Sequence, residues 1–308
     1  MNIKGFKGIK GLKQAVLIPV ALCFVLAAVY SIVFIFMDDR KRPEITMDSD
    51  VLSVSVHAGQ KAMLKGVTAT DNKDGDVTAS ILVEGISKLT DENTAVITYV
   101  AYDASGNAAK ASRTVQFTDY QPPVFGQEEA LVFASNTAPD VLEFMTAEDI
   151  LDGDISNRIK GTLLSDTTSL NYPGVHTVEF RVTNSMGDTQ YITLPVEVYQ
   201  ASDFNAKAEL TDYLVYIKTG EDFNPRSYLE NVVVGNTKYS LDPEINDELR
   251  LYFNNYVSPA INPQVDIVNI EINSDVDTDV PGVYSVSYVI DYVGRYEACT
   301  RLNVVVEE

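Results

Sequence analysis

The stretch that decides the fold occurs three times: AVITYVAYDASGN (residues 95–107), HTVEFRVTNSMGD (176–188) and YSVSYVIDYVGR (284–295). In each copy apolar and polar side chains alternate, which is the pattern of a half-buried β-strand. The inward positions are Ile97, Tyr99, Ala101; Val178, Phe180, Val182; and Val286, Tyr288, Ile290. A glycine-centred turn and a final apolar strand follow each copy, at Gly106, Gly187 and Gly294. The sequence therefore predicts three β-hairpins.

A second repeat lies upstream of the first two hairpins. ATDNKDGDVTASI (residues 69–81) reappears as AEDILDGDISNRI (residues 147–159). Further alternating runs predict strands over residues 51–57, 62–68, 79–84, 94–102 and 109–117, with Leu52, Val54 and Val56 facing inward in the first. Short strands separated by Gly, Asp, Asn and Pro are typical of β-sandwiches. The predicted fold class is therefore all-β.

Domain boundaries are expected where the final strands of the hairpins stop. They divide the chain after residue 42 into a first domain (residues 43–119), a second domain (120–200) and a third domain (201–308). The Pro122-Pro123 pair predicts a stiff, extended join between the first two. The third copy lacks the Asp-Gly-Asp turn and carries a polar insertion at about 236–263, expected to be a long loop or an extra hairpin.

One transmembrane α-helix is expected before these domains. Residues 15–37 contain no charged residue, and as a helix of about 35 Å they would cross about 30 Å of hydrocarbon. We interpret them as an uncleaved signal-anchor in the lipid bilayer; a cleaved signal peptide and a buried core helix are the alternatives. The basic tail at residues 1–14 places the N-terminus in the cytoplasm, and a mixed-charge stalk at 38–42 leads to domains outside the cell.

The amino-acid composition limits the classes of partner that the protein is expected to bind. The 308 residues include 23 Lys and Arg against 44 Asp and Glu, for a formal net charge of −21. Such a surface repels nucleic acid and favours cations or basic partners. The chain has two cysteines, Cys23 and Cys299, and hence no disulfide framework. This cysteine usage favours a bacterial surface over a small eukaryotic extracellular module.

The acidic turn and the hairpin together resemble a known family. DNKDGDVT (residues 71–78), TY (98–99), DASGN (103–107) and RTV (113–115) follow the pattern of bacterial immunoglobulin-like (Ig-like) repeats. These repeats are similar to hyalin-repeat and cadherin-like modules and occur in tandem on Gram-positive surface proteins. The resemblance implies three tandem Ig-like β-sandwiches with a spacer, adhesive or wall-associated role. It implies no chemistry.

The acidic turns are the candidate metal site. The candidate Ca²⁺ ligands are Asp71, Asp74, Asp76, Asp103, Asp119, Asp149, Asp152 and Asp154. Ca²⁺ requires six to eight oxygen ligands, and carboxylates converging at one end of a sandwich would supply several of them. The spacing does not match the EF-hand loop. The alternative is turn capping, because short Asp side chains bond to their own backbone without any metal.

Catalysis has little support in the sequence. His57 and His176 are isolated, no nucleophile or phosphate-loop motif occurs, and Cys299 is expected to be a small buried apolar residue. The protein is therefore predicted not to be an enzyme. Three aromatic residues near the insertion are candidates for sugar or protein recognition: Tyr252, Phe253 and Tyr256.

These observations predict a membrane-anchored bacterial cell-surface protein. Its Ig-like domains are expected to act as non-catalytic spacer and adhesion or recognition modules. The distal third domain would present the binding surface to an extracellular or cell-wall protein or glycan. The alternative is an accessory subunit of a membrane-bound machine that exports glycan or protein.

Overall fold

The computed structural model describes residues 19–31, 39–91, 93–164, 169–200, 206–234, 237–240, 250–252, 267–292 and 295–308. The chain divides into two compact units, Met1–Asp119 and Tyr120–Glu308. The first boundary between domains expected from the sequence coincides with this division. The second and third domains belong to one unit.

Residues 19–31 form an exposed helix within the segment expected to anchor the chain. Among the described residues, no helix is both long and apolar enough to cross a membrane. The remainder of the expected span, residues 15–18 and 32–37, lies outside the described residues. The membrane anchor therefore stays a prediction.

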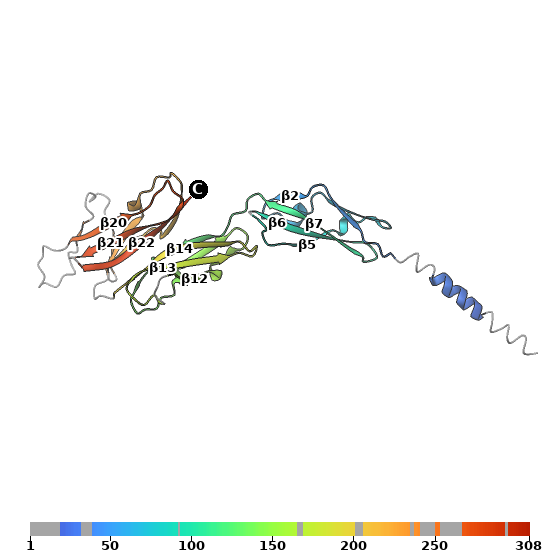
Figure 1. The fold of residues 1–308 in the computed structure, drawn as a ribbon, viewed down its shortest axis with the longest axis horizontal. Coiled ribbons are helices and arrows are strands. Elements are labelled where there is room, and N and C mark those ends of the chain that lie inside the picture. Colours follow the sequence, from blue (N-terminus) through green and yellow to red (C-terminus); the bar gives the residue numbers. More distant parts are fainter. Residues whose placement is uncertain are drawn as a thin grey trace, which may run out of the picture. The chain divides into compact units, whose positions relative to one another are not determined.

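The first domain is a sandwich of two sheets whose strands are mostly antiparallel (Figure 1). One sheet has the order β1-β3-β4 and the other the order β2-β7-β6-β5. The strands are β1 (Glu44–Met47), β2 (Val51–Val54), β3 (Val67–Asp71), β4 (Gly75–Asp76), β5 (Leu82–Ile86), β6 (Thr94–Tyr102) and β7 (Ala108–Phe117). The β6–β7 pair is the predicted hairpin, and β2 adds to its edge in parallel with β7.

The second domain repeats this strand order. Its sheets are β8-β10-β11 and β9-β14-β13-β12, with β9 again parallel to β14. The strands are β8 (Val124–Gln127), β9 (Val132–Ala134), β10 (Met145–Asp149), β11 (Gly153–Asp154), β12 (Lys160–Leu163), β13 (Gly174–Thr183) and β14 (Thr189–Tyr199). The sequence repeat is thus a repeat of topology.

The third domain keeps the same plan and extends one sheet. Its sheets are β15-β17-β18 and β16-β22-β21-β20-β19. The strands are β15 (Ala206–Leu210), β16 (Leu214–Lys218), β17 (Leu229–Val234), β18 (Thr237–Ser240), β19 (Arg250–Tyr252), β20 (Ile267–Ser274), β21 (Gly282–Tyr292) and β22 (Arg295–Glu307). The edge strand β19 comes from the predicted insertion, most of which lies outside the described residues.

The cores are built from the alternating positions that the sequence predicts. All nine predicted inward side chains are at most 2% exposed, from Ile97 on β6 to Ile290 on β21. Two residues per repeat along a strand place alternate side chains on one face, so the hairpins have a single buried side. Gly106 and Gly187 have φ of +85° and +82°, as the tight turns of the first two hairpins require.

Three expected strands of the first domain are wrong in part. The strand expected over residues 51–57 ends at Val54. Residues 62–68 do not form one strand: Gln60–Met63 form a short helix, α2, and β3 begins only at Val67. A 3₁₀ turn (Thr78–Ser80) precedes β5, which begins at Leu82. The carboxyl end of α2 is held by a tertiary contact, because the Tyr99 hydroxyl donates to the Met63 carbonyl at 2.7 Å.

Candidate functional site

The acidic turn of the first domain is closed by the first of its aspartates. Asp71 ends β3, and its Oδ1 accepts hydrogen bonds from the backbone N–H of Lys73 (2.8 Å) and Asp74 (3.0 Å). Gly75, with φ of +73°, completes the turn into β4. The backbone N–H groups of Asp74 and Lys73 lower the pKa of Asp71, so this carboxyl group is charged at neutral pH. Its other oxygen, Oδ2, is buried and has no hydrogen-bond partner.

The two other aspartates of this turn act as caps. Asp76 Oδ1 accepts the Thr78 N–H at 2.9 Å, and hydrogen bonds from Thr78 lower the pKa of Asp76. Asp74 Oδ2 accepts the Ala104 N–H at 2.8 Å, which ties the acidic turn to the β6–β7 turn. These two residues fit the turn-capping alternative.

Asp103 starts the β6–β7 turn beside Asp71. Its Oδ1 accepts the backbone N–H of Asn107 at 2.7 Å, and its Oδ2 accepts the Asn107 side-chain Nδ2 at 2.6 Å. The same Nδ2 donates to the backbone oxygen of Asp39 at 2.9 Å. The segment that leads into β1 is thereby fixed to this end of the sandwich.

Asp39, Asp71 and Asp103 converge. Each offers one carboxylate oxygen, and these three oxygens lie within 4.8 Å of one another. The three residues are only 9%, 8% and 7% exposed. Asp39 Oδ1 accepts the Lys41 N–H at 3.1 Å, whereas its Oδ2, like Asp71 Oδ2, is buried without a partner. Sequence reasoning missed Asp39, because it precedes the first predicted strand and belongs to no acidic motif.

The second domain has a different arrangement at the same place. Asp149 Oδ1 accepts the N–H groups of Leu151 and Asp152, both at 2.9 Å. Asn184 replaces Asp103, and its Nδ2 donates to Asp149 Oδ2 at 2.9 Å and to the Tyr120 hydroxyl at 2.8 Å. That hydroxyl donates in turn to Asp188 Oδ2 at 2.8 Å. Burial, followed by the hydrogen bond to Asp188, raises the pKa of Tyr120, which therefore stays neutral.

The remaining predicted metal ligands are engaged as caps. Asp152 accepts the Ser185 N–H and hydroxyl, both at 2.7 Å, and pairs with Arg158. Asp154 Oδ1 accepts the Ser156 N–H and hydroxyl, and hydrogen bonds from Ser156 lower the pKa of Asp154.

Asp119, another of the candidate Ca²⁺ ligands, caps a turn of the first domain. Its Oδ2 accepts the Ser55 hydroxyl at 2.7 Å, and its Oδ1 accepts the Val56 N–H at 2.8 Å. The Ser55 hydroxyl, followed by the Val56 N–H, lowers the pKa of Asp119. Of the eight predicted ligands, only Asp71 and Asp103 belong to the three-carboxylate cluster.

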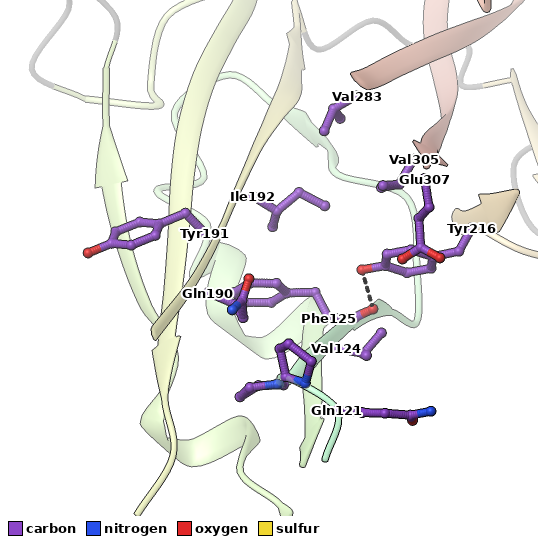
Figure 2. Close-up of a pocket in the computed structure, with 12 residues that line it drawn as sticks. Gln121, Val124, Phe125, Gln190, Tyr191, Ile192, Tyr216, Val283, Val305 and Glu307 are labelled. Carbon is purple, nitrogen blue, oxygen red and sulfur yellow. Dashed lines mark hydrogen bonds between the residues drawn. The ribbon is translucent and has the colours of Figure 1, made fainter. Parts of the chain in front are cut away.

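A cleft lies between the second and third domains (Figure 2). Its volume is about 500 Å³, and its walls come from residues 121–125 at the start of β8, the start of β14, and the strands β16, β21 and β22. Figure 2 shows the Tyr216 hydroxyl donating to the Phe125 carbonyl at 3.0 Å. Burial raises the pKa of Tyr216 to about 12. Ile192, Val283 and Val305 form much of the apolar lining.

Polar contacts also join these two domains. Arg301 on β22 pairs with Glu197 on β14 at 3.2 Å, and this glutamate is only 3% exposed. Asn303 Nδ2 donates to Gln127 Oε1 at 2.8 Å. Leu214 and Val305 of the third domain pack against the core of the second. The two sandwiches therefore share an interface of apolar and charged contacts.

The remaining sequence candidates do not form a catalytic arrangement among the described residues. His57 is exposed, whereas His176 is buried and its Nε2 lies 2.8 Å from the Tyr172 carbonyl. Cys299 is 2% exposed, and burial raises the pKa of its thiol. Tyr252 ends the edge strand β19; Phe253 and Tyr256 lie outside the described residues.

Comparisons with known proteins point to one family. Residues 46–117 match the model of the family described as "Bacterial surface protein, Ig-like domain". An uncharacterised 81.3 kDa protein of Acholeplasma phage L2 is 35% identical over 101 residues, which are 33% of this chain and 13% of that protein. The chain therefore spans a small part of this relative.

Solved structures resemble the chain only distantly. A Clostridium perfringens ZmpB structure holds INT domains and CBM51-2 in complex with GlcNAc; it is 18% identical, with 49% of this chain and 26% of that one covered, at a TM-score of 0.20. The protocadherin GammaB4 extracellular domain is 10% identical, with 88% and 52% covered, at a TM-score of 0.21. Residues 46–117 are thus similar to bacterial surface Ig-like domains, and the strand order of this first domain recurs in the two domains that follow.

Proposed function

We propose that this protein is a membrane-anchored bacterial cell-surface protein whose Ig-like domains act as non-catalytic spacer and recognition modules. The observation that carries the proposal is the match of residues 46–117 to a bacterial surface Ig-like family, together with the repetition of that sandwich along the chain. Sandwiches of this type bury their hairpins on one side and leave loops free at both ends, which suits them to act as spacers.

The anchor in this proposal is the uncharged segment at residues 15–37, with the N-terminus in the cytoplasm. The support is the length of the uncharged run and the basic residues that precede it. The Ig-like domains would then lie outside the cell. The acidity of the exterior domains is compatible with that location, since it keeps them soluble and away from anionic lipid.

The third domain is the proposed recognition module, for a cell-wall or extracellular protein or glycan. It differs from the other two by the added edge strand β19, which extends the longer sheet at the residues of the insertion. The interface with the second domain would hold it in a set orientation. A sheet that is extended in one domain only is a natural place for a specialised surface.

Protease treatment of intact cells tests the proposal. A tag after residue 308 is expected to be removed by external protease, while the protein stays in the membrane fraction until detergent is added. Release by salt alone, or protection of the tag in intact cells, would contradict it. Crosslinking in native membranes tests the alternative: a partner recovered in constant stoichiometry would favour an accessory subunit of an export machine.

Recognition needs a separate measurement. Full-length protein on beads is expected to bind purified cell walls. Deletion of residues 241–263, which spares β18, is expected to abolish this binding without lowering the melting temperature of the second unit. Equal binding by the deletion variant would place recognition elsewhere.

A further inference from the structure

The three-carboxylate cluster of the first unit lacks partners that buried charges require. Asp39, Asp71 and Asp103 are all more than nine-tenths buried, and two of their oxygens, Asp39 Oδ2 and Asp71 Oδ2, have no hydrogen-bond partner. A buried carboxylate oxygen without a donor carries a desolvation cost, and three like charges at close range add repulsion. A bound cation would remove both penalties at once.

The second domain shows how the same position is satisfied without a cation. Its counterpart of Asp71, Asp149, has both oxygens bonded, because Asn184 supplies an N–H donor in place of the third carboxylate. The Tyr120 hydroxyl fills the remaining space between Asn184 and Asp188. The two sandwiches of the same topology thus differ at this end: the second oxygen of Asp149 has a donor, whereas the second oxygens of Asp71 and Asp39 have none.

The strand register shows which residue of the second domain corresponds to Asp39. Glu44 pairs with Thr70 in the first domain, and Val124 pairs with Glu148 in the second. By this register the second-domain counterpart of Asp39 is Asp119, the residue before Tyr120. The second domain therefore presents the neutral Tyr120 hydroxyl at the end of the sandwich where the first domain presents the Asp39 carboxylate.

We infer that Asp39, Asp71 and Asp103 bind one Ca²⁺ ion at this end of the first domain. Ca²⁺ takes oxygen ligands at about 2.3–2.6 Å, so two oxygens on one ion lie no more than about 5 Å apart. The three carboxylate oxygens are within 4.8 Å of one another and meet this limit. Ca²⁺ accepts ligands from irregular loops and completes its shell with water, whereas Mg²⁺ demands a near-ideal octahedron.

The ion would join three separate segments of the first unit. Asp39 belongs to the segment that leads into β1, Asp71 ends β3, and Asp103 follows β6. Asn107 already links two of these segments through its bonds to Asp103 and to the Asp39 backbone. Ca²⁺ binding would therefore stiffen the entry of the chain into the first domain, which goes beyond the proposed spacer function.

Calorimetry on the full-length protein in detergent, stripped of metal with a chelator, tests this site. Titration with CaCl₂ is expected to show one ion per chain and to raise the melting temperature of the first unit. Asp39→Asn and Asp103→Asn should each weaken binding by at least about tenfold, because each removes one of three charged ligands. Asp76→Asn is the matched control: it lies in the same turn but caps Thr78, so binding should change by less than about twofold.

A second readout separates ligation from a purely structural role. In chelator, Asp39→Asn should melt at or above the wild-type temperature, since its Oδ1 can still accept the Lys41 N–H, its Oδ2 has no partner to lose, and the change relieves repulsion. A merely structural residue would lower the melting temperature equally with and without Ca²⁺. Absence of binding heat, unchanged affinity in both cluster variants, or equally tight binding of MgCl₂ would each overturn the assignment.

Discussion

Asn184 Nδ2 donates to Asp149 Oδ2 at 2.9 Å in the second domain, at the position where the first domain sets the Asp103 carboxylate beside Asp71. One amide in place of one carboxylate separates a closed hydrogen-bond network from a cluster with two unpartnered oxygens. The two domains should therefore respond oppositely in stability: adding a carboxylate should destabilise the second domain, whereas removing one should not destabilise the first.

Asn184→Asp should destabilise the second unit. The change removes the donor to Asp149 and to the Tyr120 hydroxyl and places two buried carboxylates together, at a cost of about 1–3 kcal/mol. Thermal unfolding at neutral pH in the presence of chelator measures it. Asp39→Asn is the control: it removes a carboxylate whose Oδ2 has no partner, and it should not destabilise the first unit under the same conditions. Loss of stability in both variants would show that the two networks are not related as described.

Tyr99→Phe should cost more than Tyr288→Phe. The Tyr99 hydroxyl donates to the half-buried Met63 carbonyl and accepts from the buried Arg113 Nε at 2.9 Å, so its loss removes two hydrogen bonds. The Tyr288 hydroxyl donates one hydrogen bond, to the Pro225 carbonyl. We expect about 2–3 kcal/mol against about 1 kcal/mol. Denaturant unfolding of the two units, followed separately, compares them; equal costs would contradict the role assigned to Arg113.

Glu197→Gln should weaken the interface between the second and third domains. Arg301 would lose its charged partner at a site where Glu197 is 3% exposed, and we expect a loss of roughly 1–3 kcal/mol in the unfolding free energy of the second unit. The control is Glu209→Gln, whose partner Lys238 is largely exposed and whose loss should cost below about 1 kcal/mol. Calorimetry that shows no difference between the two variants would argue against a coupled interface.

Acid should unfold the first unit in part through Asp119. The folded state holds the pKa of this carboxyl group below its ordinary value of 3.8. Its stabilisation is therefore present above pH 3.8 and is lost as the pH falls below that value toward the lowered pKa. Melting temperatures of Asp119→Asn should depend less on pH across this window than those of the wild type. An identical dependence would mean that the Ser55 and Val56 bonds do not survive in solution.

Sequence alone determined the hairpins, because burial on a strand follows a local period of two. The pattern from Ile97 to Ala101 repeats in the second and third copies, and in all three it predicts both the strand and its buried face. Gly106 and Gly187 likewise mark the turns, since positive φ is a local demand. The acidic turns are also local sequence patterns, so the sequence predicted them and identified Asp71 and Asp103 as candidate ligands.

Only the tertiary structure decided which carboxylates meet. Asp39 lies far from Asp71 and Asp103 in the sequence and has no motif, yet packing brings its oxygen within 4.8 Å of theirs. Asp119 was a candidate ligand, but it accepts hydrogen bonds from Ser55 and Val56. Residues 60–63 form α2, whose end is bonded by the distant Tyr99 hydroxyl. Local periodicity encodes which side of a strand is buried, whereas the convergence of charged side chains depends on how distant segments pack, and no local pattern encodes that.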